Sequence, residues 1–262
     1  MHVIPLLFAL VFGNKSLDMF SELEKGALLE YDCEKKLFLH NQKTYHILTG
    51  KLENVSSKPL IYIGSYPLGR EILCFDPAAS PLLEGHYASF ISLIPKNSTV
   101  IELLSLMTSY IRNAVFSMER CKESTLNAFI YDWVHDKKRT DSDFTPTNKN
   151  FYLPLISIEE FIQSKIGVCR QLAFVSTYFL DRLIDSKLLV GKAYFVRDLV
   201  SARHRSGGHA WSLFIDAEGD AWHIDPLWNV IYNLTDPSQY EILCNLYGTL
   251  AMQRQLQRLL EK

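Results

Sequence analysis

The spacing of apolar positions changes along the chain, and each spacing predicts a type of element. Apolar residues recur every three to four positions over 17–30, 101–115, 125–135 and 239–260, which predicts helices there. From 37 to 94 the apolar runs are short and rich in β-branched and aromatic residues, and glycine and proline separate them. That texture predicts short strands joined by turns. The chain is therefore expected to be an α+β protein.

A further helix is predicted to begin at Cys169 and to end near Ser186. Gly167 comes just before it and lets the chain turn, and a short helix over 158–164 is expected upstream because Ser157 is followed by a glutamate three residues later. Apolar residues then return at helical spacing, namely at Leu172, Val175, Phe179 and Leu183. Cys169 thus lies at a helix N-terminus, where the backbone N–H groups and the helix dipole favour a thiolate.

Three strands are expected after this helix, at Lys192–Leu199, Ala210–Asp216 and Ala221–Ile224. The turn between the last two can be a three-residue loop, Ala217–Gly219, with Gly219 in the left-handed conformation.

This turn sets the register of the hairpin. With the three-residue loop, His209 lies opposite position 227, and Asp225 shares its face as a diagonal neighbour. A two-residue loop would turn Asp225 to the opposite face. We prefer the three-residue loop, because glycine suits its left-handed position. An imidazole–carboxylate hydrogen bond is then expected between His209 and Asp225.

Cys169, His209 and Asp225 supply the three groups that thiol-based acyl transfer requires. The thiolate attacks a carbonyl, the imidazole holds the thiolate as an ion pair and later protonates the leaving group, and the carboxylate fixes the imidazole tautomer.

The same positions carry a resemblance to a known family. Gly-Val-Cys-Arg followed by Ala173, His-Ala-Trp at 209–211 and Trp-His-Ile-Asp-Pro at 222–226 resemble the transglutaminase-like superfamily in order and spacing, over about residues 100–230. The resemblance implies a papain-like core, in which a nucleophile helix packs on an antiparallel sheet, and makes Cys169, His209 and Asp225 the catalytic triad. Members of that superfamily include protein cross-linkers, deamidases, peptidases, peptide amidases and inactive relatives.

The resemblance does not reach the first part of the chain. Residues 1–95 are expected to be a β-rich extension or accessory layer, and residues 96–262 the transglutaminase-like catalytic domain.

Other residues of the predicted site leave alternatives open. Gln163 is an oxyanion-hole candidate, since it lies six residues before Cys169, the offset found in papain-type enzymes. Trp211 is expected as a wall of the cleft, although it can equally belong to the core. His204 and His223 are rival bases.

Arg170 has two interpretations. It can lower the pKa of the neighbouring thiol, or it can form a surface salt bridge.

Composition narrows the possible functions. The 262 residues are 48% hydrophobic and 21% charged with a formal net charge of -2, which argues against a nucleic-acid partner. The five cysteines contain no CxxC pair, which argues against a disulfide framework and a zinc knuckle. No Asp/Asn-rich calcium loop is present. Neither a metal nor a cofactor is therefore expected.

An apolar run at 3–12 is too short for a stable membrane span. It is either a packed first element or a signal segment, so a cytoplasmic and a secreted location both remain open.

The sequence thus predicts a cysteine-dependent acyl-transfer enzyme that acts on peptide or side-chain amides. Hydrolysis, as a protease or deamidase, is preferred, because water needs no second binding site. The alternatives are a protein-glutamine transglutaminase that uses an amine acceptor and a non-catalytic binding module of the same fold. The expected partner is a protein or peptide substrate.

Overall fold

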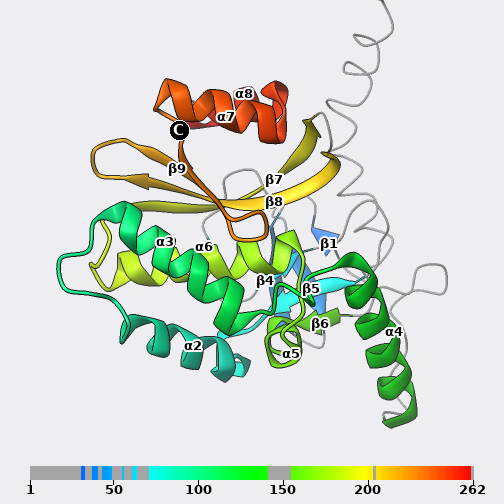
Figure 1. The fold of residues 1–262 in the computed structure, drawn as a ribbon. Coiled ribbons are helices and arrows are strands. Elements are labelled where there is room, and N and C mark those ends of the chain that lie inside the picture. Colours follow the sequence, from blue (N-terminus) through cyan, green and yellow to red (C-terminus); the bar gives the residue numbers. More distant parts are fainter. Residues whose placement is uncertain are drawn as a thin grey trace, which may run out of the picture.

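The computed structural model describes residues 31–32, 37–40, 43–48, 55, 61–63, 71–140, 155–202 and 205–260. The predicted helix at 17–30, the apolar run at 3–12 and His204 lie outside this part of the chain. Within it the protein is a mixed α+β structure (Figure 1).

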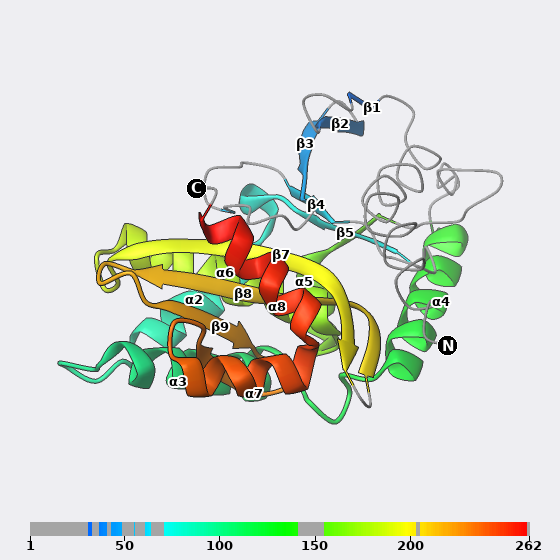
Figure 2. The same cartoon turned by 90° about the horizontal axis from the view of Figure 1, so that it is seen from above.

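A four-stranded antiparallel sheet lies between two helical layers (Figure 1). One face packs against α6 (Cys169–Asp185), and the other against α7 (Pro237–Tyr247) and α8 (Thr249–Leu260). Figure 2 shows α7 and α8 lying across this second face. The strands, in sheet order, are β10 (Val230–Asn233), β9 (Ala221–Asp225), β8 (Arg205–Asp216) and β7 (Gly191–Ala202).

A second sheet is built mainly from the first part of the chain. Its order is β1-β2-β3-β4-β5-β6, with β3–β4 and β5–β6 parallel and the other pairs antiparallel. The strands are β1 (Tyr31–Asp32), β2 (Leu37–His40), β3 (Lys43–Ile47), β4 (Ile61–Ile63), β5 (Ile72–Phe75) and β6 (Leu155–Ser157). The remaining helices are η1 (Pro77–Ala79), α2 (Pro81–Ile91), α3 (Val100–Tyr110), the π-helix η2 (Ile111–Val115), α4 (Glu123–Thr140) and α5 (Ile158–Ser164).

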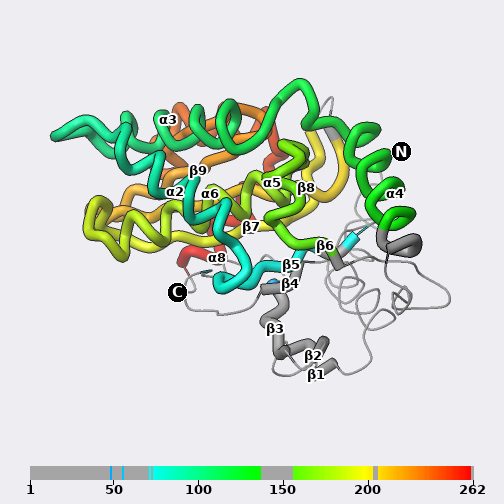
Figure 3. Tube along the Cα trace, turned by 90° about the horizontal axis from the view of Figure 1, so that it is seen from below, coloured from blue at the N-terminus to red at the C-terminus, as the bar shows by residue number. Residues whose placement is uncertain are grey.

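Helix α6 is the centre of the larger hydrophobic core. Residues on nearly all of its sides are buried, as expected for a helix enclosed by other elements. The sheet covers one side, and α2 and α3 cover the side away from the sheet (Figure 3). The predicted start of this helix at Cys169 is confirmed, and its end at Asp185 is within one residue of the prediction.

The expectation of strands throughout 37–94 is wrong for residues 81–91, which form α2. The buried residues of α2 are Leu83, Tyr87 and Phe90, spaced four and three apart, which is a helical period. Two of these three residues are aromatic, and aromatic residues also favour strands, so the composition of the segment predicts a strand. Elsewhere in the same stretch a short strand does form, namely β5.

Residues 71–94 share one core with the helices that follow. β5 pairs in parallel with β6, and the ring of Phe75 lies 5.1 Å from that of Phe174 on α6. Most of residues 1–70 lie outside the described part of the chain, so an accessory role for this region stays a prediction.

The single helix predicted over 239–260 is two helices that meet at Gly248. Gly248 has a φ of 91°, and a Cβ atom there would lie 2.3 Å from the carbonyl oxygen of Ser201 on β7. The close approach of this turn to β7 requires glycine, and it seats α7 and α8 on the sheet.

Gly248→Ala should therefore lower the free energy of unfolding by about 2–4 kcal/mol, since a left-handed alanine is strained and its methyl group overlaps backbone atoms. Gly85→Ala is the matched control. Gly85 lies inside α2 with no atom near its added Cβ, so alanine should raise stability by about 0.5–1 kcal/mol. Equilibrium urea unfolding measures both, and equal stabilities of Gly248→Ala and the unsubstituted protein would contradict this account.

Candidate active site

Cys169 is the first residue of α6 and is partly exposed. Val168 before it is extended, and its backbone N–H donates to Oε1 of Gln171 at 3.1 Å, which fixes the start of the helix. Gly167 is closely packed, because a Cβ atom there would lie 2.9 Å from Leu172 and 3.0 Å from Phe116. The turn into α6 therefore holds Cys169 at the edge of the core.

The hairpin that carries the other two residues has the predicted register. Asp216 and Asp220 close a three-residue loop, and Gly219 has a φ of 91°. Ser212 pairs with Ile224, and Leu213 pairs with His223. The prediction that a three-residue loop sets this pairing is confirmed.

The structure brings Cys169, His209 and Asp225 together. Nε2 of His209 lies 2.6 Å from Oδ2 of Asp225, and both residues are buried. The thiol of Cys169 lies within interaction range of the His209 side chain and of the Ala210 backbone N–H, and both lower its pKa. Because Nε2 is engaged by the carboxylate, Nδ1 is the imidazole nitrogen that remains for the sulfur.

The Cys169 thiol meets β8 beyond the part of that strand that pairs with β9. The pairing of β8 with β9 ends at Ser212 and Ile224, so Ala210 lies beyond it. The chain leaves β9 after Asp225, and Arg112 of η2 holds the departing segment by donating to the carbonyl oxygens of Pro226 and Leu227.

Asp225 receives hydrogen bonds from three elements. In addition to His209, the hydroxyl of Tyr247 at the end of α7 donates to Oδ2 at 2.6 Å, and the backbone N–H of Trp228 donates to Oδ1 at 3.1 Å. The indole ring of Trp228 stacks on the imidazole of His209, with ring centroids 3.8 Å apart and an interplanar angle of 14°. The carboxylate and imidazole are thus fixed in one orientation.

The electrostatics of the group favour a thiolate–imidazolium pair. Burial raises the pKa of the Cys169 thiol. The His209 side chain and the Ala210 backbone N–H together lower this pKa by a larger amount, so the net shift is downward. Burial lowers the pKa of His209, but the charges of Cys169 and Asp225 outweigh it and raise the pKa to about 9. Burial likewise opposes ionisation of Asp225, whose pKa is nevertheless lowered, chiefly by His209 and then by Tyr247.

A buried ion pair anchors the same end of α6 from the other sheet. Arg170 donates to Oε1 and to the backbone carbonyl of Glu71, and Nε2 of Gln171 donates to that Oε1 at 3.1 Å. The side chains of Arg170 and Glu71 are only 5% and 0% exposed. The expectation of a surface salt bridge at Arg170 is therefore wrong: it forms a buried pair that positions the helix.

Trp211 and Gln163, the two other residues predicted at the site, lie in different environments. Trp211 is fully buried and donates its indole N–H to Gln255, so it belongs to the core and does not form a cleft wall. Its assignment failed because the parity of a strand gives a face but not the layer that covers it. Gln163 is exposed on α5, and its role as an oxyanion donor stays a prediction.

The rival base His223 lies in a different environment. It is fully buried, its ring lies 4.3 Å from that of Tyr247, and burial lowers its pKa to about 3. A neutral, enclosed imidazole of this kind is a packing residue.

Sequence reasoning missed Glu71, Arg112, Trp228 as the stacking partner, and Tyr247. Tyr247 lies within the predicted helix at 239–260, and nothing in the local pattern distinguishes a tyrosine that packs from one that also donates to a carboxylate. Only the three-dimensional contact reveals it.

Within the described ranges, no three or more His, Cys, Asp or Glu side chains are grouped as a metal site. The same ranges contain no helix with the length and apolar character needed to span a membrane.

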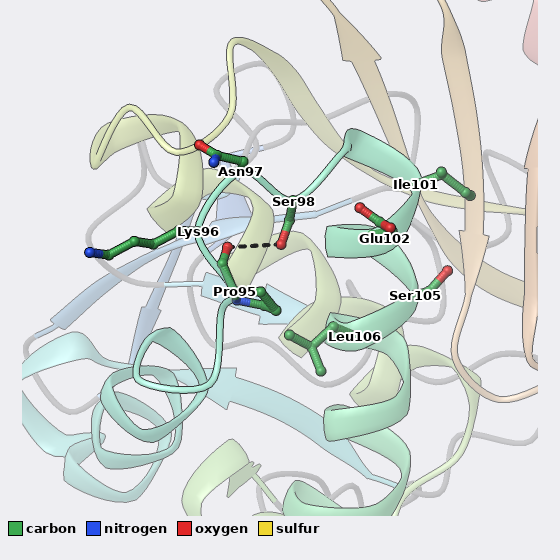
Figure 4. Close-up of a pocket in the computed structure, with 8 residues that line it drawn as sticks. All are labelled: Pro95, Lys96, Asn97, Ser98, Ile101, Glu102, Ser105 and Leu106. Atoms are coloured by element: carbon green, nitrogen blue, oxygen red, sulfur yellow. Dashed lines mark hydrogen bonds between the residues drawn. The ribbon is translucent and has the colours of Figure 1, made fainter.

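The structure also has hollows outside this group. One, with a volume of about 620 Å³, lies between the loop after α2 and the first turns of α3 (Figure 4). It is lined by Pro95, Lys96, Asn97, Ser98, Ile101, Glu102, Ser105 and Leu106. None of these residues belongs to the Cys169 group. A smaller hollow of about 320 Å³ beside α4 includes Ile166, three residues before Cys169.

Comparisons with protein-family models, with curated proteins and with solved structures found no match for this chain.

The thiol of Cys169 should react with iodoacetamide faster than the other thiols near neutral pH, since its pKa is lowered whereas burial raises that of Cys121. As the pH is increased, the alkylation rate of Cys169 should rise at pH values below the ordinary thiol pKa and then reach a plateau. The rate should change again where His209 loses its proton, at about pH 9. Peptide mapping after timed alkylation measures each thiol separately. Equal labelling of Cys169 and Cys121 across this range would contradict the electrostatic account.

The buried pair beside Cys169 gives a second prediction. Glu71→Leu alone should lower the free energy of unfolding by about 3–5 kcal/mol, because it leaves the Arg170 charge without its buried carboxylate. Glu71→Leu combined with Arg170→Met should recover most of that loss, since the charge is removed as well. Urea unfolding of both variants is the measurement, and a double variant as unstable as the single one would contradict an electrostatic origin of the loss.

Proposed function

We propose that this protein is a cysteine-dependent acyl-transfer enzyme acting on peptide or side-chain amides. One observation carries the proposal: the side chain of His209 interacts with the thiol of Cys169, whose pKa it lowers, and is hydrogen-bonded to the carboxylate of Asp225. A nucleophile, a base and an orienting group in that arrangement are the parts that covalent acyl transfer needs.

The chemistry would proceed in two steps. The Cys169 thiolate attacks the amide carbonyl, and the imidazolium of His209 gives its proton to the departing amine as the C–N bond breaks. In the resulting thioester, His209 takes a proton from water while the oxygen of that water attacks the carbonyl, and the thiolate leaves. Asp225 keeps the imidazole in the required tautomer throughout.

Two donors are candidates for the oxyanion that forms in each step. The backbone N–H of Cys169 lies at the N-terminus of α6, where it has no partner within the helix. Gln163 is the side-chain candidate.

Hydrolysis remains the preferred reaction, as protease or deamidase, because water requires no second binding site. Amine transfer to a lysine is the alternative outcome of the same thioester. A papain-like, transglutaminase-type core is part of the proposal, supported by the contact between the nucleophile helix and an antiparallel sheet. A protein or peptide is the proposed substrate.

The test incubates the protein with a peptide mixture from a digested proteome and follows the products by mass spectrometry. Cleavage would indicate a protease, a gain of about one dalton a deamidase, and amine addition a transglutaminase. Cys169→Ala should reduce product formation by at least about 1,000-fold, since it removes the nucleophile, whereas Cys244→Ala on α7 should leave it unchanged.

Product formation that persists at full rate in Cys169→Ala would overturn the proposal. A cellular effect of the protein that survives the same substitution would favour a non-catalytic binding module.

A further inference from the structure

The last residue of α7 contacts the group that contains Cys169, although it lies 22 residues beyond Asp225 in the sequence. The hydroxyl of Tyr247 donates to Oδ2 of Asp225 at 2.6 Å, on the same oxygen that receives Nε2 of His209 at 2.6 Å. Tyr247 is completely buried. Its hydroxyl is therefore shielded from solvent where it donates to that oxygen.

The aromatic surroundings fix the direction of the hydroxyl. The ring of Tyr247 lies 4.8 Å from that of Trp228, 5.5 Å from Trp211 and 4.3 Å from His223. Gly248, the next residue, lies against the backbone of Ser201 on β7 and seats the end of α7 on the sheet. The phenol is therefore held at its acceptor by packing on several sides.

We propose that Tyr247 is a positioning residue that acts on His209 and Cys169 through the carboxylate of Asp225. This inference rests on the proposed function, and it makes the C-terminal helices part of the reaction centre. With the Trp228 N–H on the other oxygen, the carboxylate has two fixed donors besides the imidazole. It cannot rotate away from His209 without losing them.

The phenol also keeps Asp225 ionised. The titratable groups that face Asp225 are His209 from β8, His223 from β9, Tyr247 from α7 and, through His209, Cys169 from α6. His223 is neutral near pH 7. The imidazolium of His209 and the hydroxyl of Tyr247 are therefore the main groups that offset the desolvation of the Asp225 carboxylate. Without the hydroxyl, the buried carboxylate binds a proton more readily and the thiolate–imidazolium pair is lost at a higher pH.

The test is the pH profile of alkylation of Cys169 by iodoacetamide in the full chain, which needs no substrate. Tyr247→Phe keeps the ring and removes only the donor. The acid limb of the profile should move to higher pH, and the rate on that limb should fall at least about ten-fold, as expected for the loss of one hydrogen bond to a buried charge. Tyr240→Phe, which removes a hydroxyl that faces Cys244 on the same helix, is the matched control and should leave the profile unchanged.

A double-mutant cycle separates positioning from a general loss of structure. In an Asp225→Asn background, Tyr247→Phe should have no further effect on the profile, because the carboxylate through which it acts is absent. An equal effect in both backgrounds would overturn the inference.

A second substitution keeps the inference testable if Tyr247→Phe folds poorly. Incorporating 3,5-difluorotyrosine at position 247 retains the hydroxyl and makes it a stronger donor, so the acid limb should move in the opposite direction, to lower pH. A shift to higher pH, or none, would contradict the inference. If the unsubstituted thiol itself titrates with an ordinary pKa, the proposed function fails; a lowered thiol pKa that ignores position 247 defeats only the role of Tyr247.

Discussion

The arrangement of the site depends on one buried carboxylate. Asp225 is fully buried, and an isolated carboxylate in such a place would be strongly destabilised. It is accommodated because β8, α7 and the segment after β9 each direct a donor at it, from His209, Tyr247 and Trp228. The same hydrogen bonds that compensate its burial orient the imidazole towards Cys169. The hydrogen bonds of Asp225 therefore stabilise the fold and also position the groups of the candidate site.

Two supports hold the thiol at the other end of the group. The turn through Gly167 and the N-terminus of α6 place Cys169 at the edge of the larger core. The buried pair of Glu71 and Arg170 ties this end of α6 to β5 of the other sheet. The position of the sulfur thus depends on both sheets, although β7–β10 alone carry His209 and Asp225. The helix cannot move from its place without separating a pair of buried charges.

Local signals in the sequence were sufficient for the hairpin and for the nucleophile helix. Gly219 indicates the three-residue loop, the loop sets the register, and the register places Asp225 on the face of His209. Contacts between distant elements had no such signal. The pairing of Glu71 with Arg170 spans 99 residues, and the assignment of Trp211 to a cleft wall failed because periodicity does not reveal which layer covers a face. In helix α2, two of the three buried residues are aromatic, and aromatic residues also favour strands, so composition alone does not separate the two structures there.

The protonation state of His209 tests the central claim most directly. In the substrate-free protein at about pH 7.5, ¹⁵N NMR of selectively labelled histidine should show His209 doubly protonated, because its pKa is raised to about 9. Its Nε2 proton should lie in a short hydrogen bond. Cys169→Ala should return it towards the neutral form, since the thiolate charge is then absent. A neutral His209 in the unsubstituted protein at that pH, unaffected by Cys169→Ala, would contradict the ion pair on which the account is built.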